Sequence, residues 1–150
     1  LPYLILRNEP PPKVVAILLS GGYGLLRLRQ EEGGIAIDPA GVEFLVKSKE
    51  SFVDDETTVA LVDTPSDQAS IVLTPRFRKS DKHVADLSTL VGDLKTRFPH
   101  ARIALIGNSL GTISAAYGAV ALRDMVDAVV LSATVFEWLP GSWRLLSDSI

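Results

Sequence analysis

A serine between two glycines is the residue of this sequence best placed to do chemistry. Residues 102–116 read as an apolar strand, then Gly107-x-Ser109-x-Gly111, then a helix of small residues. This order is typical of a nucleophile elbow, a sharp strand-to-helix turn that exposes a serine hydroxyl above a sheet. Gly107 and Gly111 lack the side chains that would collide in such a turn. We therefore predict that Ser109 is a nucleophile and that its φ angle is positive.

The residues around this serine support the same interpretation. The N–H of Leu110 would stand at the start of a helix, where it could face the negative charge that develops on a reacting carbonyl oxygen. Residues 103–106 form a buried-strand run, and residues 110–122 are compatible with a helix whose alanines permit close packing. The alternative is a glycine-rich turn with a serine of no special role, because glycine makes up about 7% of average composition. The flanking strand and helix favour the elbow.

Composition places the chain among ordinary globular domains. It has 150 residues, of which 47% are hydrophobic and 22% charged, and this suits one domain with a sizeable core. The net charge of −3 and the lack of a basic stripe argue against a nucleic-acid partner. No apolar run approaches the roughly 18 residues that span a bilayer. The sequence has no cysteine and its two histidines are far apart, so we expect no disulfide and no metal site. The predicted serine chemistry implies no organic cofactor either.

The elements that must position Ser109 alternate between strands and helices. An edge strand is expected at residues 4–7, and continuous apolar runs indicate buried strands at residues 14–19, 58–63, 103–106 and 126–132. Start and stop signals indicate helices at residues 38–52, 80–98 and 110–122. This alternation predicts an α/β domain with a mostly parallel sheet and helices on both faces.

Three stretches between the strands carry expectations of their own. Residues 20–24, Ser-Gly-Gly-Tyr-Gly, form a loop in which the backbone can approach a ligand closely. Residues 25–37 carry several charges and are expected to be an exposed excursion. In the helix at 38–52, Glu43 and Lys47 are expected to form a supporting pair four residues apart.

The order of these motifs resembles the α/β-hydrolase superfamily over nearly the whole chain. The resemblance implies that Ser109 is the nucleophile, that Leu110 gives one oxyanion N–H, and that Gly22 or Tyr23 in the glycine-rich loop gives the second. Where the family often has His-Gly, this chain has Ser20-Gly21. The general pattern is also similar to exported bacterial hydrolases of the dienelactone-hydrolase type, which favours an exported over a cytoplasmic protein.

The catalytic partners of the serine are harder to find. The family's triad order is serine, then acid, then histidine, but no histidine follows Ser109. His100 is expected on the surface at the opposite end of the sheet, and a capping or solvent role is expected for His83. Glu137 lies where some members place the acid, and Asp148 is a weaker candidate, but for both an ordinary surface role is favoured.

The simplest explanation is that residues 1–150 are a single but incomplete α/β-hydrolase domain. We expect the C-terminal strands, with the acid and the histidine, to lie outside this chain. The last strand would then leave an open sheet edge, through which the isolated chain would self-associate.

Two nucleotide-binding alternatives fail on their spacing. A dinucleotide fingerprint would need a glycine where Arg27 stands, and a Walker loop would need Gly-Lys-Ser or Gly-Lys-Thr. We therefore expect a serine hydrolase that cleaves an ester, a thioester or a related acyl bond of a small molecule. Two alternatives stay open: an inactive hydrolase-fold binding or scaffold protein, and an acyltransferase or thioesterase that uses the same elbow.

Overall fold

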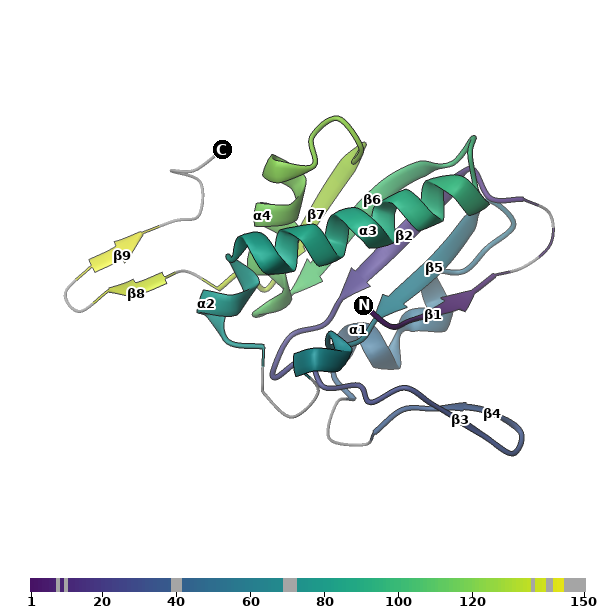
Figure 1. Ribbon diagram of the computed structural model, residues 1–150, viewed down its shortest axis with the longest axis horizontal. Coiled ribbons are helices and arrows are strands. Elements are labelled where there is room, and N and C mark those ends of the chain that lie inside the picture. The colour runs from purple at the N-terminus through teal and green to yellow at the C-terminus, as the bar shows by residue number, and fades with distance from the viewer. Residues whose placement is uncertain are drawn as a thin grey trace.

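The main sheet of this computed structural model has five strands and is mostly parallel (Figure 1). The structure describes residues 1–7, 9, 11–38, 42–68, 73–135, 137–139 and 142–144. The strands lie in the order β1 (Tyr3–Leu6), β5 (Thr57–Val62), β2 (Val14–Leu19), β6 (Arg102–Asn108) and β7 (Ala128–Ser132). Only β1 runs antiparallel to its neighbour in this sheet. The predicted parallel sheet with β1 at an edge is therefore confirmed, and β6 lies between β2 and β7.

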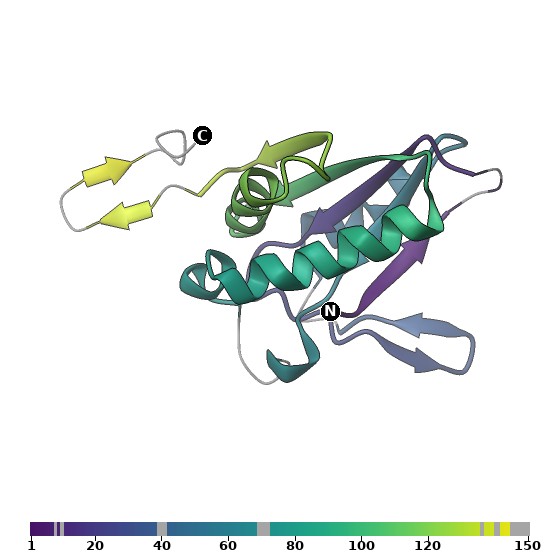
Figure 2. The same ribbon diagram turned by 45° about the horizontal axis from the view of Figure 1, so that its top comes forward.

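The continuous apolar runs of β2 and β5 form parallel strands because both faces of the sheet are covered there. In β2 and in β5 every residue except the first is buried. Strand β7 is mostly exposed, so the prediction of a buried strand at residues 126–132 is wrong for its burial. Helices α3 (Asp81–Arg97) and α4 (Gly111–Ala121) cover one face, where they lie side by side (Figure 2). The short helix α1 (Phe44–Lys47) packs against the other face. Helices on both faces are thus also confirmed.

Helix α3 follows its sequence signals closely. The side chain of Ser80 accepts a hydrogen bond from the N–H of His83 and caps the helix. Leu87, Leu90 and Leu94 repeat at helical spacing and are buried against the sheet. The helix ends at Arg97, two residues before Pro99, so the prediction of a helix at 80–98 is confirmed.

The expected helix at residues 38–52 is much shorter than predicted. Residues 39–41 lie outside the described part of the chain, and Glu43 has the extended φ and ψ of −114° and −171°. Helix begins at Phe44 and continues after Lys47 only as the 3₁₀ turn η2 (Lys49–Phe52). Glu43 is the N-cap of α1, and its side chain forms no ion pair with Lys47 in the described part of the chain, so the predicted pairing is wrong. Burial instead raises the pKa of the Glu43 carboxyl above its ordinary value.

The remaining elements are short. Strands β3 (Arg29–Glu31) and β4 (Gly34–Ala36) form a mostly exposed hairpin, as expected for this part of residues 25–37. Leu26 is fully buried in the core, so the expected exposure is wrong for the start of that stretch. The other short elements are η3 (Ser66–Gln68), α2 (Pro75–Arg78), and a second hairpin of β8 (Glu137–Leu139) and β9 (Ser142–Arg144). In the described part of the chain, no helix combines the length and apolarity that crossing a bilayer requires.

Candidate active site

Ser109 stands in a tight turn at the carboxyl end of an interior strand. It follows the last residue of β6, comes two residues before α4, and has a φ of 51°. Its N–H donates to the carbonyl oxygen of Ser132 at 3.0 Å, and its own carbonyl oxygen accepts from the Thr112 hydroxyl at 2.6 Å. A left-handed backbone is uncommon for a residue with a side chain. The φ of Ser109 thus confirms the positive value that the sequence predicted.

The two glycines of the motif are required by packing rather than by their own φ angles. A Cβ atom on Gly111 would lie 2.0 Å from the carbonyl oxygen of Leu19 in β2. A Cβ atom on Gly107 would lie 2.6 Å from the carbonyl oxygen of Gly111. Because neither the strand nor the turn can move away cheaply, a side chain at either position would open the turn.

The glycine-rich loop after β2 packs directly on this serine. A Cβ atom on Gly21 would lie 3.0 Å from the Cβ of Ser109 and 3.6 Å from its hydroxyl oxygen. The loop turns back on itself, because the N–H of Gly24 donates to the carbonyl oxygen of Gly21 at 3.2 Å and Gly22 has a φ of 52°. The loop backbone thus lies directly beside Ser109, and the expected close approach to a ligand stays a prediction.

Three N–H groups in the turn and the adjacent loop form no hydrogen bond in the described structure. Among the described residues, the N–H groups of Leu110, Gly22 and Tyr23 donate to no protein acceptor. The side chain of Tyr23 is 68% exposed, so the loop reaches solvent. Leu110 belongs to the turn itself, whereas Gly22 and Tyr23 belong to the loop that packs on it. The structure therefore brings these donors and Ser109 to one end of the sheet.

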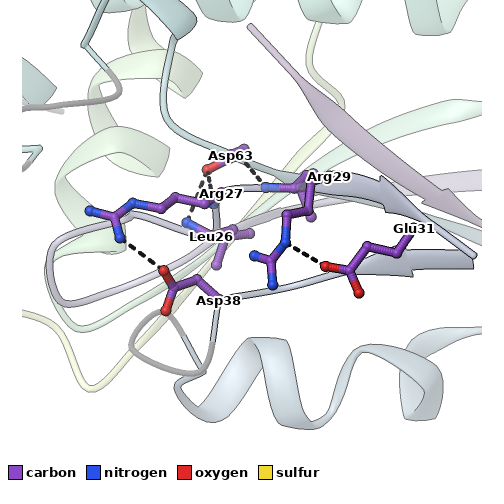
Figure 3. Close-up of polar contacts among 7 residues, drawn as sticks. Leu26, Arg27, Arg29, Glu31, Asp38 and Asp63 are labelled. Atoms are coloured by element: carbon purple, nitrogen blue, oxygen red, sulfur yellow. Dashed lines mark hydrogen bonds and ion pairs between the residues drawn. The ribbon is translucent and has the colours of Figure 1, made fainter.

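Asp63 organises the chain that leaves the glycine-rich loop (Figure 3). It follows β5, and its carboxylate accepts the backbone N–H groups of Leu26 at 2.9 Å, Arg27 at 3.0 Å and Leu28 at 2.8 Å. It also accepts from the N–H of Thr64 at 2.7 Å. Sequence reasoning missed this role, although an acidic residue directly after a buried strand is a signal that could have suggested it.

Arg27 and Arg29 do not share this buried environment. Each donates to a nearby carboxylate, Arg27 to Asp38 at 2.9 Å and Arg29 to Glu31 at 2.6 Å (Figure 3). Both ion pairs involve half-exposed arginine side chains, so they contribute little to stability. The backbone contacts to Asp63, rather than these pairs, fix the course of the chain here.

His83 is buried, and the expected solvent role for its ring is wrong. The residue is 2% exposed, and its Nε2 lies 2.9 Å from the hydroxyl oxygen of Ser114 in α4. Only its backbone N–H takes part in capping, through Ser80. Burial, followed by the charge of Arg78, lowers the pKa of His83 to about 4. The imidazole is therefore neutral at pH 7.

The other predicted partners of Ser109 do not gather around it. His100 is exposed and precedes β6, at the end of the sheet opposite Ser109. Glu137 begins β8, but its side chain lies outside the described part, as does the whole of Asp148. Neither histidine forms a hydrogen bond with Ser109 in the described structure, because His83 contacts Ser114 and His100 lies at the other end of the sheet.

The sequence also matches a known protein family. The family described as serine aminopeptidase, S33, matches residues 69–147, a little over half of the chain. The matched range contains α3, β6, α4 and β7, and therefore the turn at Ser109. No curated protein matches this chain.

Proposed function

Because this chain belongs to the serine aminopeptidase S33 family, within the α/β-hydrolase superfamily, we propose that it is a serine hydrolase of ester, thioester or related acyl bonds. The observation that supports this most is the left-handed turn of Ser109, closed by two glycines between β6 and α4. Its hydroxyl oxygen attacks the carbonyl carbon of the substrate, and a base takes its proton. We propose no metal or organic cofactor for this reaction.

The available N–H groups supply the electrostatic part of the reaction. When the tetrahedral intermediate forms, its oxyanion accepts from the Leu110 N–H and from the N–H of Gly22 or Tyr23. The carbon–leaving group bond then breaks, the leaving group takes a proton, and the acyl group stays on Ser109. Water attacks the acyl-enzyme and restores the free hydroxyl, with release of a carboxylic acid.

The base and the triad acid belong, in this proposal, to chain that follows residue 150. The engagement of His83 by Ser114 and the exposed place of His100 at the opposite end support this view. Residues 1–150 would then be the N-terminal part of the catalytic domain. Without the base, the chain should hydrolyse an aryl ester several orders of magnitude more slowly than the whole gene product, because loss of a triad member leaves only about 10³–10⁴-fold acceleration over water.

Kinetics of the whole gene product test the proposal. We expect it to hydrolyse p-nitrophenyl acetate, and Ser109→Ala to lower kcat/KM at least about 10³-fold. Ser66→Ala is the matched control, because Ser66 is an exposed serine on η3, and it should leave the rate unchanged. Equal rates for the wild type and Ser109→Ala would remove Ser109 from the mechanism and favour a binding or scaffold protein.

The family description favours one second candidate, an aminopeptidase. An aminopeptidase should cleave an aminoacyl p-nitroanilide with a free amino group and should reject its N-acetylated form. An esterase should hydrolyse the p-nitrophenyl ester and leave both anilides intact. An acyltransferase would transfer the acetyl group to an added alcohol faster than to water. All three activities should disappear in Ser109→Ala.

We also propose that the 150-residue chain self-associates through β7. This strand is the last in the order of the described main sheet, and Val129 and Val130 are 41% and 49% exposed. An unpaired apolar edge is a template for pairing with another chain. Sedimentation should show concentration-dependent dimers or larger species that Val130→Lys suppresses. A stable monomer at all concentrations would contradict the proposal.

A further inference from the structure

A buried arginine joins the glycine-rich loop to the helix that follows Ser109. Arg78, at the end of α2, is 2% exposed. Its guanidinium donates to the hydroxyl oxygen of Ser114 in α4 at 3.0 Å and to the carbonyl oxygen of Leu73 at 3.1 Å. It also donates to the carbonyl oxygen of Gly22 at 3.3 Å. No sequence signal marked this residue, since an arginine in a charged segment is usually a surface residue.

The burial of this cation is costly, and packing alone does not explain it. A methionine or leucine would fill the same space without the desolvation of a charge. In the described structure, Arg78 forms no ion pair, and the carboxylate that acts on its charge is that of Glu43. Burial lowers the pKa of Arg78 to about 10, so it is still charged at neutral pH. What it provides is a set of charged donors aimed at neutral oxygens.

The contact with Gly22 fixes the direction of a peptide group. In a trans peptide the C=O of one residue and the N–H of the next point in opposite directions. When Arg78 holds the Gly22 carbonyl, the Tyr23 N–H must point away from Arg78. Glycine allows many backbone angles, so this peptide would otherwise rotate easily. The loop also lies close to Arg78 at Gly24, where a Cβ would be 3.1 Å from Nη2 of Arg78.

We propose that Arg78 is a positioning residue that holds the Gly22 carbonyl and thereby orients the loop N–H groups toward the oxyanion formed at Ser109. The inference rests on the proposed role of Ser109. The groups concerned are the N–H of Gly22, on one side of this carbonyl, and that of Tyr23, on the other. Arg78 does not touch the substrate in this account. Its simultaneous bond to Ser114 keeps the loop in register with α4, which begins at the serine turn.

The test compares Arg78→Met and Arg78→Lys with Arg76→Met in the whole gene product. Arg76 lies on the same helix but is exposed, so it is the matched control. We expect Arg78→Met to lower kcat about 10²-fold while KM changes less than about threefold, because an oriented donor acts mainly in the transition state. The affinity for a trifluoromethyl ketone, which forms an oxyanion adduct with the serine, should fall by the same factor. Arg78→Lys keeps one charged donor, so its kcat and ketone affinity should lie between those of Arg78→Met and Arg76→Met.

The outcomes separate this inference from the proposed function. If Ser109→Ala abolishes hydrolysis and both Arg78 variants keep kcat and ketone affinity within twofold of Arg76→Met, Arg78 has no positioning role. A lower melting temperature with unchanged kcat per folded molecule would likewise overturn it. If Arg78→Met does not fold, Arg78→Lys decides on the same readouts. Hydrolysis that survives Ser109→Ala would reject the proposed function itself.

Discussion

The two ends of the main sheet differ in whether their polar side chains are buried or exposed to solvent. At the carboxyl end, where β2, β5 and β6 finish, most of the buried polar side chains form hydrogen bonds with one another or with loop backbone. At the amino end, the Lys13–Glu56 ion pair at 2.6 Å has side chains that are 70% and 60% exposed, and His100 is exposed. Among the buried polar residues of the described chain, all but Thr58 lie at the carboxyl end: Ser20, Asp63, Thr64, Arg78, His83, Thr112 and Ser114.

This difference indicates which end of the sheet is specialised. Burial of a polar group costs free energy unless the group finds partners, so a fold without a site would leave such groups in water, as the amino end does. In open parallel sheets, ligands bind outside the carboxyl ends of the strands. Substitutions at the carboxyl end should therefore cost more stability than those at the amino end, and only they should change the chemistry of Ser109.

The largest effect is expected at Gly111. Gly111→Val would drive a β-branched side chain toward the carbonyl oxygen of Leu19, which lies 2.0 Å from the Cβ position. We expect the free energy of unfolding to fall by about 4 kcal/mol, measured by chemical denaturation. Gly92→Ala is the control, because its Cβ would meet no atom within 4 Å inside α3, and it should stabilise the protein by about 0.5–1 kcal/mol. Equal stability of Gly111→Val and wild type would show that the turn is not tight.

Acid should weaken the carboxyl end through His83. The pKa of His83 is about 4 in the folded protein, whereas an imidazole in the unfolded chain has the ordinary value of 6.5. The unfolded chain therefore binds the proton more readily. The stabilisation by neutral His83 is complete above pH 6.5 and is lost as the pH falls toward 4, a loss of about 3 kcal/mol. Denaturation at pH 7, 5.5 and 4 should show this decline, which His83→Gln should reduce and His100→Gln should not. The same pH dependence in both variants would contradict the assignment.

Asp63→Asn should have an intermediate effect. The amide nitrogen that replaces one carboxylate oxygen cannot accept from the N–H groups of Leu26, Arg27 and Leu28, so at least one donor loses its partner. We expect a loss of about 2 kcal/mol. Hydrogen exchange should show faster exchange of these amides, whereas amides of β7 should be unaffected. Unchanged protection at all three amides would show that Asp63 does not hold this segment.

The smallest effect is expected at the amino end. Glu56→Gln removes an exposed ion pair with Lys13 and leaves the backbone contacts of Glu56 in place. Such pairs contribute little, and we expect the free energy of unfolding to change by less than about 0.5 kcal/mol. The rate of ester hydrolysis should stay the same. A loss as large as that of Asp63→Asn would remove the contrast between the two ends.

Local signals in the sequence predicted most of the fold. The apolar run at 14–19, the Ser80 cap and Pro99 stop around α3, and the glycines beside Ser109 each act within a few residues. The backbone at Ser109 could be predicted because its geometry follows from the spacing of Gly107 and Gly111. The length of the helix predicted at 38–52 was too great. The helix-start signal at Asp38 does not determine where the chain begins to pack on the sheet, and α1 begins only at Phe44.

The polar contacts of the carboxyl end could not be predicted, because their partners are distant in sequence. Asp63 accepts from Leu26, 37 residues away, and His83 meets Ser114, 31 residues away. Neither residue type has a local pattern that identifies such a partner. Once the strands are aligned in parallel, however, their carboxyl ends meet, and polar residues that follow different strands become neighbours.

Labelling with a fluorophosphonate tests the central claim, an activated Ser109, most directly. The hydroxyl oxygen of an activated serine displaces fluoride from the reagent and forms a stable adduct that mass spectrometry can locate. On the whole gene product, we predict one adduct on the peptide that contains Ser109, lost in Ser109→Ala and retained in Ser66→Ala. An adduct on another residue that persists in Ser109→Ala, or no adduct on a folded protein, would contradict the claim.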